Sequence, residues 1–165
     1  IQTDASNVER INRWSCAVRM GIDEPVFGFG PGMYQFEYGR FQLPTDLTNI
    51  STFHGNKGHA HSEILGALAE SGFPGMLLAV VFMFSAIGYG LNVIYNTKDP
   101  YRRWIAYAAL LGLVSFYVHG FFNAFLDTDK MAILVFGSIA VIIATDLENR
   151  KSVAAGLTTS VPDNE

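Results

Sequence analysis

The sequence predicts an all-α integral membrane protein, with a helical segment outside the membrane followed by three transmembrane helices. Half of the 165 residues are hydrophobic, the mean hydropathy is +0.24, and only 16% of residues are charged. The charges are also unevenly spread, since Asp, Glu, Lys and Arg are absent from residues 73–95 and from residues 104–125. Uncharged apolar runs of this length are typical of membrane-spanning helices.

Residues 1–72 are expected to form the segment outside the membrane, with two short helices. Ser6 and Glu9 have the spacing of a capping box, which predicts a first helix that ends near Gly21. Pro25 and the following GFGPG end any helix and require tight turns, and residues 33–58 resemble an irregular aromatic loop. A second short helix is expected over residues 61–70.

Three apolar runs are expected to cross the membrane, and Gly72, Pro74 and Gly75 should separate the first from the helix before it. The runs cover residues 73–95, 104–125 and 131–145. A helix rises ~1.5 Å per residue, so the first two runs cross a hydrocarbon core of ~30 Å. The third run is marginal in length, although Lys130 could extend its reach by snorkelling; the alternative for it is a buried helix of a soluble protein.

The positively charged loops predict the orientation of these helices. The link after the first run carries Lys98, Arg102 and Arg103, and the stretch after the third run carries Arg150 and Lys151. Such residues mark the cytoplasmic side, which places residues 1–72 and the turn at residues 126–130 on the outer side. Residues 148–165 are expected to form a cytoplasmic tail, small and polar from residue 152 and therefore disordered.

Composition excludes several classes of protein. The net charge of −4 and the absence of a basic cluster argue against nucleic acid as a partner. The single cysteine, Cys16, excludes an internal disulfide framework. The chain begins at Ile1 with neither a methionine nor a signal peptide, and we expect it to be part of a longer protein.

The stretch GHAHSEILGALAESGFPG, at the outer mouth of the first apolar run, contains the first candidate site residues. His61 could accept a proton from a hydroxyl group near neutral pH. His59, His61 and Glu63 would share one face of an extended strand and could bind a metal with His54, but a helix that begins near His61 would separate them. A surface histidine that caps a helix is the third interpretation.

Arginines supply a second candidate site. Arg10 and Arg13 are three residues apart on the first predicted helix, and Arg19 and Arg40 follow. Guanidinium groups bind phosphate oxygens with two parallel hydrogen bonds, so these side chains could bind a phosphorylated ligand. A solvated helix face or anchoring to lipid headgroups is the alternative.

Two further motifs allow more than one interpretation. The GFGPG cluster lacks the G-x-G-x-x-G spacing of a phosphate-binding loop and is better explained as a turn. His119 and Asn123 are four residues apart, which would place them on one face of the second transmembrane helix, before Asp127, Asp129 and Lys130. They could bond to a neighbouring helix or line a cavity that binds the substrate.

The order of these motifs resembles the C-terminal part of the O-antigen ligase and polymerase family of bacterial membrane glycosyltransferases. The resemblance covers residues 6–147, and its most specific pieces are Arg10 four residues before Trp14, the PVFGFGPG turn, and AHSEILGALAESGFPG. It implies a metal-independent and cofactor-free enzyme of the bacterial inner membrane. Residues 1–72 would be periplasmic, and the C-terminus would be cytoplasmic.

The resemblance also implies substrates and residue roles. The donor would be a glycan linked to undecaprenyl diphosphate, the acceptor a hydroxyl group of a glycan or lipid, and membrane lipids would surround the helices. His61 matches the family histidine, and Arg10 matches the arginine that binds the diphosphate. Arg13, Glu63, His119 and Asn123 are supporting candidates. Ser62 departs from the asparagine that often follows the family histidine.

Other functions remain open at this stage. A polysaccharide polymerase of the same family would have the same motifs. A non-catalytic transport or assembly subunit would share the transmembrane helices, and a metal-dependent membrane hydrolase would use the histidines differently.

Overall fold

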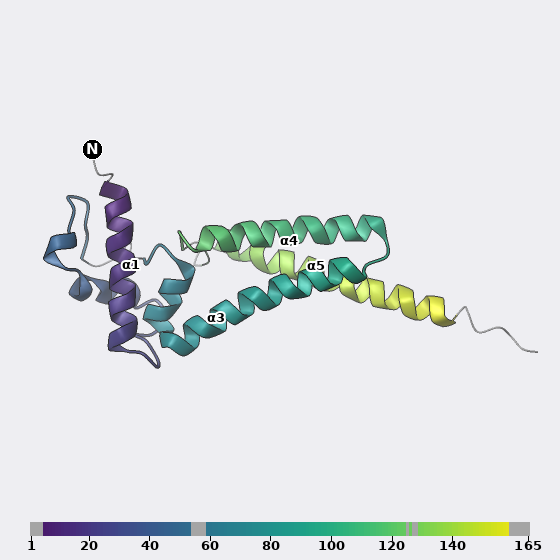
Figure 1. Cartoon of the computed structure of the whole chain (residues 1–165), viewed down its shortest axis with the longest axis horizontal. Helices are drawn as coiled ribbons and strands as arrows, with labels where there is room; N and C mark the ends of the chain where they lie inside the picture. Colours follow the sequence, from purple (N-terminus) through teal and green to yellow (C-terminus); the bar gives the residue numbers. More distant parts are fainter. Residues whose placement is uncertain (1–4, 54–58, 125, 127–128, 159–165) are drawn as a thin grey trace, which may run out of the picture. The chain divides into compact units, whose positions relative to one another are not determined.

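The computed structural model describes residues 5–53, 59–124, 126 and 129–158, and helices joined by turns and loops make up this part (Figure 1). The five α-helices are α1 (Ala5–Asp23), α2 (Tyr34–Glu37), α3 (Glu63–Asn96), α4 (Pro100–Gly120) and α5 (Asp129–Thr158). Two 3-10 turns, η1 (Tyr38–Phe41) and η2 (Pro44–Asp46), follow α2. No strand occurs among these residues, so the all-α prediction is confirmed.

The chain forms two compact units. Unit 1 comprises Ile1–Met83 and Tyr117–Thr128, and unit 2 comprises Phe84–Phe116 and Asp129–Glu165. Both α3 and α4 therefore contribute a part to each unit.

Unit 1 has a small core in which α1 packs on the segments that follow it. The core contains Cys16, Ala17, Met20, Tyr34, Tyr38, Ala60 and Ala69. A Cβ atom on Gly21 would lie 2.5 Å from Leu68 Cγ, so only glycine allows α1 to approach the start of α3 this closely. Burial of its thiol raises the pKa of Cys16 to about 11, so the thiol stays protonated at neutral pH.

The start of α1 differs from the prediction. The helix is already formed at Ala5, so Ser6 lies inside it and does not cap it. The carboxylate of Glu9 instead accepts hydrogen bonds from Arg13, one helical turn away, and from Ser51 of a distant segment. The helix ends at Asp23, two residues beyond the predicted stop at Gly21.

The predicted break before the first apolar run is confirmed at Gly72. Its backbone has φ 67° and ψ −170°, which interrupts α3 between two helical segments. The amide of Phe73 donates to the carbonyl oxygen of Pro25 over 2.8 Å, and a Cβ atom on Gly72 would lie 2.5 Å from that oxygen. Pro74 lies in the first turn after the break, where a proline costs no helical hydrogen bond.

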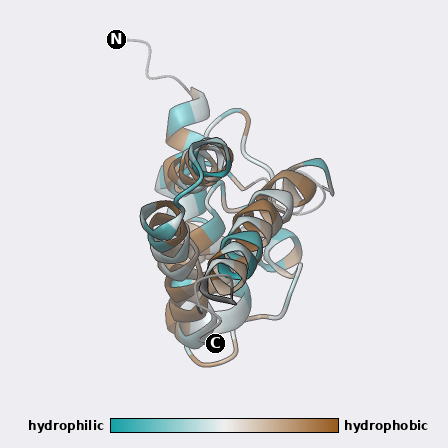
Figure 2. Ribbon diagram, turned by 90° about the vertical axis from the view of Figure 1, so that its right-hand side faces the viewer, coloured by the Kyte–Doolittle hydropathy of each residue, from teal (hydrophilic) through white to brown (hydrophobic). Residues whose placement is uncertain are grey.

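Unit 2 consists of helices that carry apolar side chains both inside and outside, and Figure 2 shows hydrophobic residues along much of their length. Its buried side chains include Val93, Leu113 and Ile142. Large apolar side chains such as Leu111 and Ile133 are 68% and 71% exposed. A helix that is apolar on all sides suits a lipid environment.

Two helices are long and apolar enough to cross a membrane, where the sequence predicts three. They are Glu63–Asn96 and Lys130–Gly156. Among the described residues, α4 does not reach the same hydropathy, because tyrosines, Trp104 and His119 interrupt its apolar residues. The 15-residue third run is part of the much longer α5.

The predicted disorder from residue 152 is wrong as far as the described residues extend. Helix α5 continues to Thr158. Ala154 and Ala155 favour helix, and the hydroxyl of Ser152 donates to the carbonyl oxygen of Glu148. Residues 159–165 lie outside the described part.

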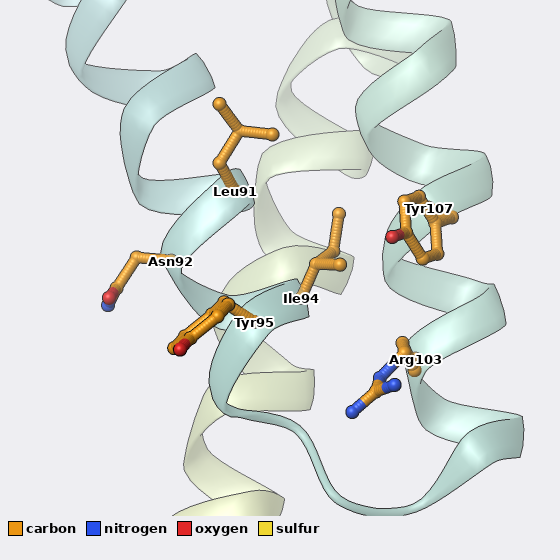
Figure 3. A pocket seen from close by; sticks show the side chains of 6 residues that line it. All are labelled: Leu91, Asn92, Ile94, Tyr95, Arg103 and Tyr107. Carbon is orange, nitrogen blue, oxygen red and sulfur yellow. The ribbon is translucent and has the colours of Figure 1, made fainter.

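Arg103 of α4 forms hydrogen bonds with the backbone just after the end of α3. Its Nε and Nη2 donate to the carbonyl oxygen of Thr97 over 3.0 and 2.7 Å, which satisfies a free carbonyl after α3. Beside it lies a pocket of about 630 Å³, to which α4 contributes Arg103 and Tyr107 and α3 contributes the rest (Figure 3). The lining from α3 consists of Leu91, Asn92, Ile94 and Tyr95.

Candidate functional site

His61 has an unusual backbone conformation. Its φ is 50°, and it is the only described residue other than glycine with a positive φ. The left-handed region costs such a residue roughly 1–2 kcal/mol. Strained backbone of this kind gathers at functional sites, where surrounding contacts hold it in place.

Trp14 of α1 provides one of those contacts. The indole Nε1 donates a hydrogen bond to the carbonyl oxygen of His61 over 3.1 Å. The indole ring also packs on Phe122, with the ring centroids 6.2 Å apart. The sequence motif included this tryptophan, but its contact with His61 depends on two segments 47 residues apart in the chain.

Ser62 begins the helix that follows His61. Its side chain is buried, its Oγ accepts a hydrogen bond from the amide of Leu65 over 3.4 Å, and its carbonyl oxygen accepts one from Gly66. This is the geometry of an N-cap, so the helix begins at Glu63, two residues after the predicted start. Serine and asparagine are about equally good N-caps, which gives a physical reason why either residue can follow the histidine.

The imidazole of His61 is neutral at physiological pH. Burial and, to a smaller extent, the positive charges of nearby His59, Arg13 and Arg10 together lower its pKa to about 4, against an opposing effect of Glu9. The His59 and His61 rings lie 4.0 Å apart between centroids. His61 therefore has a free lone pair that can accept a proton.

Arg13 is buried within unit 1. Its Nε donates to Glu9 Oε1 over 2.8 Å, its Nη2 donates to Thr52 Oγ1 over 2.8 Å, and its guanidinium carbon lies 4.3 Å from the centre of the Tyr38 ring. Burial raises the pKa of Glu9, but hydrogen bonds from Ser51 and Arg13 outweigh this and lower it overall. The guanidinium of Arg13 thus binds groups of the protein itself.

Arg10 differs from the other arginines of unit 1. Arg19 donates to the carbonyl oxygen of Phe41 and pairs with Asp46, and Arg40 pairs with Glu37. Arg10 is half-buried and forms no ion pair or hydrogen bond with any residue that the structure describes. It lies four residues before Trp14 on α1, so both side chains share the helix face on which His61 is held.

Glu63 connects the histidine segment to the residues after α4. Its Oε1 accepts a hydrogen bond from the amide of Leu126 over 2.7 Å. A Cβ atom on Gly120 would lie 3.1 Å from Glu63 Cγ, so the two segments touch closely. Together with the Trp14–Phe122 contact, this brings Gly120, Phe122 and Leu126 to the segment around His61.

The prediction that His119 and Asn123 share a helix face is wrong. Helix α4 ends at Gly120, and the amide of Phe122 bonds to the carbonyl oxygen of His119 in a turn, so Asn123 lies beyond the helix. His119 is exposed at the end of α4, and Lys130 is exposed at the start of α5. Asp127 and the side chain of Asp129 lie outside the described part.

The structure gives no support to the metal-site alternative. The described residues bring together no group of three His, Cys, Asp or Glu side chains that could hold a metal ion. His54, the fourth proposed ligand, lies outside them.

The PVFGFGPG segment is a turn, as predicted. The amides of Phe29 and Gly30 donate to the carbonyl oxygens of Ala69 and Glu70 over 3.0 and 2.9 Å, which satisfies the end of the helix before Gly72. A Cβ atom on Gly28, whose φ is 64°, would lie 2.4 Å from the backbone of Glu70. These backbone hydrogen bonds therefore join the PVFGFGPG segment directly to the AHSEILGALAESGFPG segment.

Comparison with protein families shows what the part of the chain that contains this arrangement is similar to. Residues 1–80 match the O-antigen ligase family model. The resemblance predicted from the motifs is confirmed, and the matched part contains Arg10, Trp14, His61, Ser62 and Glu63. Comparisons with curated proteins and with solved structures gave no match.

Proposed function

We propose that the protein is a membrane glycosyltransferase of the O-antigen ligase type, which transfers a glycan from an undecaprenyl diphosphate carrier to an acceptor hydroxyl group. The observation that carries this proposal is the arrangement on one face of α1. There Arg10, a cation with no acidic partner among the described residues, lies near the neutral imidazole of His61. The O-antigen ligase match covers both residues.

In this reaction the acceptor oxygen forms a bond to the anomeric carbon of the glycan. The bond from that carbon to the diphosphate oxygen breaks, and the carrier leaves with the bonding electron pair. The hydroxyl proton passes to the free nitrogen of His61 and later to water. Within this chain we assign the proton transfer to His61 and the stabilisation of the leaving group to Arg10, and the full-length protein is needed for activity.

The charges of the site suit both roles. Negative charge develops on the leaving diphosphate, and the guanidinium of Arg10 stabilises it in the transition state. His61 begins in the neutral form that a base requires, but with a pKa of about 4 it is a weak base. The negative charge of a bound diphosphate favours protonated histidine, so donor binding raises the pKa of His61 and strengthens the base.

We place the enzyme in the inner membrane of a bacterium, with residues 1–72 in the periplasm and the C-terminus in the cytoplasm. The positive residues at Lys98, Arg102 and Arg103 support this orientation. Acceptors would be glycans or lipids on the periplasmic side. A polymerase that extends the same glycan would use the same groups, and the identity of the acceptor product distinguishes it from a ligase.

Replacement of His61 and Arg10 tests the proposal in cells that express the full-length protein. His61→Ala should reduce the glycan-modified product about 100-fold or more, the usual contribution of a general base, and Arg10→Ala should reduce it to a similar degree. Arg40→Ala is the matched control, because the Arg40 side chain is 63% exposed and paired with Glu37, and it should retain the product within about twofold.

Membrane insertion of each variant is measured by quantitative immunoblotting of membrane fractions. Normal product levels from well-inserted His61→Ala and Arg10→Ala proteins would refute the proposal. Purified full-length protein that binds lipid-linked glycan but transfers none would favour the transport or assembly alternative.

A further inference from the structure

The conformation of His61 requires a contact that maintains it. A left-handed φ of 50° is unfavourable for a histidine, and the helix that begins at Glu63 does not include it. An unsupported residue of this kind would relax to an ordinary backbone conformation, which would redirect its side chain.

Trp14 is placed to prevent that relaxation. Its indole N–H bonds to the carbonyl oxygen of His61 itself, 3.1 Å away, and its ring is fixed in turn by Phe122. On the other side of His61, the N-cap of Ser62 holds the chain where the helix begins. The carbonyl oxygen of His61 is therefore bonded to Trp14 of α1. The next residue, Ser62, is bonded to Leu65 of α3.

We propose that Trp14 is a positioning residue that holds the left-handed backbone of His61 and thereby aims the imidazole at the site beside Arg10. This rests on the function proposed above, in which His61 accepts the proton. Trp14 and Arg10 lie one helical turn apart on α1. One rigid helix thus sets both the place of the cation and the orientation of the base.

The test compares the two tryptophans of the chain in purified full-length protein. The substrates are lipid-linked glycan and acceptor, both extracted from the cells that make the protein. Trp14→Phe keeps an aromatic ring against Phe122 but removes the N–H donor. It should lower kcat about tenfold, the rate equivalent of one lost hydrogen bond, and leave KM for the donor within about twofold because Arg10 is unchanged.

Trp104→Phe is the matched control. Trp104 is 69% exposed on α4 and contacts Tyr107, so its replacement should leave both constants unchanged. Equal kcat for Trp14→Phe, Trp104→Phe and the parent protein would overturn the proposal. If Trp14→Phe does not insert, benzothienylalanine at position 14 in the Trp104→Phe protein removes only the donor, with sulfur in place of N–H, and the same kcat loss is expected.

A second measurement does not depend on catalysis. His61→Asn tolerates a left-handed backbone and His61→Val does not, so the valine variant should melt at a lower temperature. In the Trp14→Phe protein the backbone can relax, and this difference in melting temperature should shrink. An undiminished difference would show that other contacts hold the backbone. If instead the melting data agree but His61→Ala remains fully active, the proposed function fails and the structural role of Trp14 stands.

Discussion

Units 1 and 2 differ in how deeply their polar side chains are buried. In unit 1, buried polar groups bond across long stretches of sequence, as in Asn12 to Gln42 and Arg13 to Thr52. Unit 2 also has a long-range bond from Tyr89 to Asp146, but its basic side chains Arg150 and Lys151, paired with Asp146 and Glu148, are mostly exposed. The first arrangement fixes side chains of distant segments relative to one another, as a chemical site requires. Exposed ion pairs like those of unit 2 contribute little to stability.

The largest expected difference between the units concerns their ion pairs. Arg13→Ala should destabilise unit 1 by about 3–5 kcal/mol, because it leaves the buried carboxylate of Glu9 without its cation. Arg150→Ala should cost less than ~1 kcal/mol, since the Arg150 side chain is 70% exposed.

Hydrogen exchange followed by mass spectrometry measures both effects, because peptides from each unit report their own local stability. Equal losses of protection in the two variants would contradict the view that buried ion pairs hold unit 1 together.

Glycines should show the next largest difference. Gly72→Ala should destabilise unit 1 by at least ~2 kcal/mol, because alanine is strained at a φ of 67° and its Cβ would lie 2.5 Å from the oxygen of Pro25. Gly156→Ala in α5 should instead stabilise by about 0.5–1 kcal/mol, since nothing lies near its added methyl group and alanine favours helix. Thermal unfolding of both full-length variants in detergent gives the sign of each change.

Acidification should produce a smaller effect, to which His61 of unit 1 contributes. The pKa of His61 is lowered from 6.5 to about 4, so the unfolded state binds more protons between these values. Stability contributed by neutral His61 is therefore complete above pH 6.5 and is lost as the pH falls towards 4. The lowered pKa of Glu9 acts in the same direction at lower pH.

Melting temperatures measured from pH 7 to pH 4 test this dependence. The parent protein should lose stability over this range, and His61→Asn should show a shallower slope. A slope that is the same in both proteins would mean that His61 titrates normally in the fold.

Local patterns predicted much of unit 1. The break at Gly72 and the turn at residues 25–32 follow from glycine and proline, whose conformations depend little on their surroundings. The start of α1 was predicted less well. The carboxylate of Glu9, which the prediction assigned to a capping box, instead accepts hydrogen bonds from Arg13 and Ser51. The prediction that His119 and Asn123 share one helix face was wrong because hydropathy does not show that α4 ends at Gly120.

The sequence by itself determined that the chain is helical and that Arg10 and His61 belong to a recognisable set of motifs. It also predicted three membrane-spanning helices after residue 72, of which two are long and apolar enough among the described residues. These features are local, and periodicity or residue type is enough to read them. Only the tertiary structure decided that Arg13 is enclosed by Glu9 and Thr52 and that Arg10 makes no such bond within the described part. The contact between Trp14 and His61 also became visible only there, because 47 residues separate the two and no local pattern records which distant groups will meet.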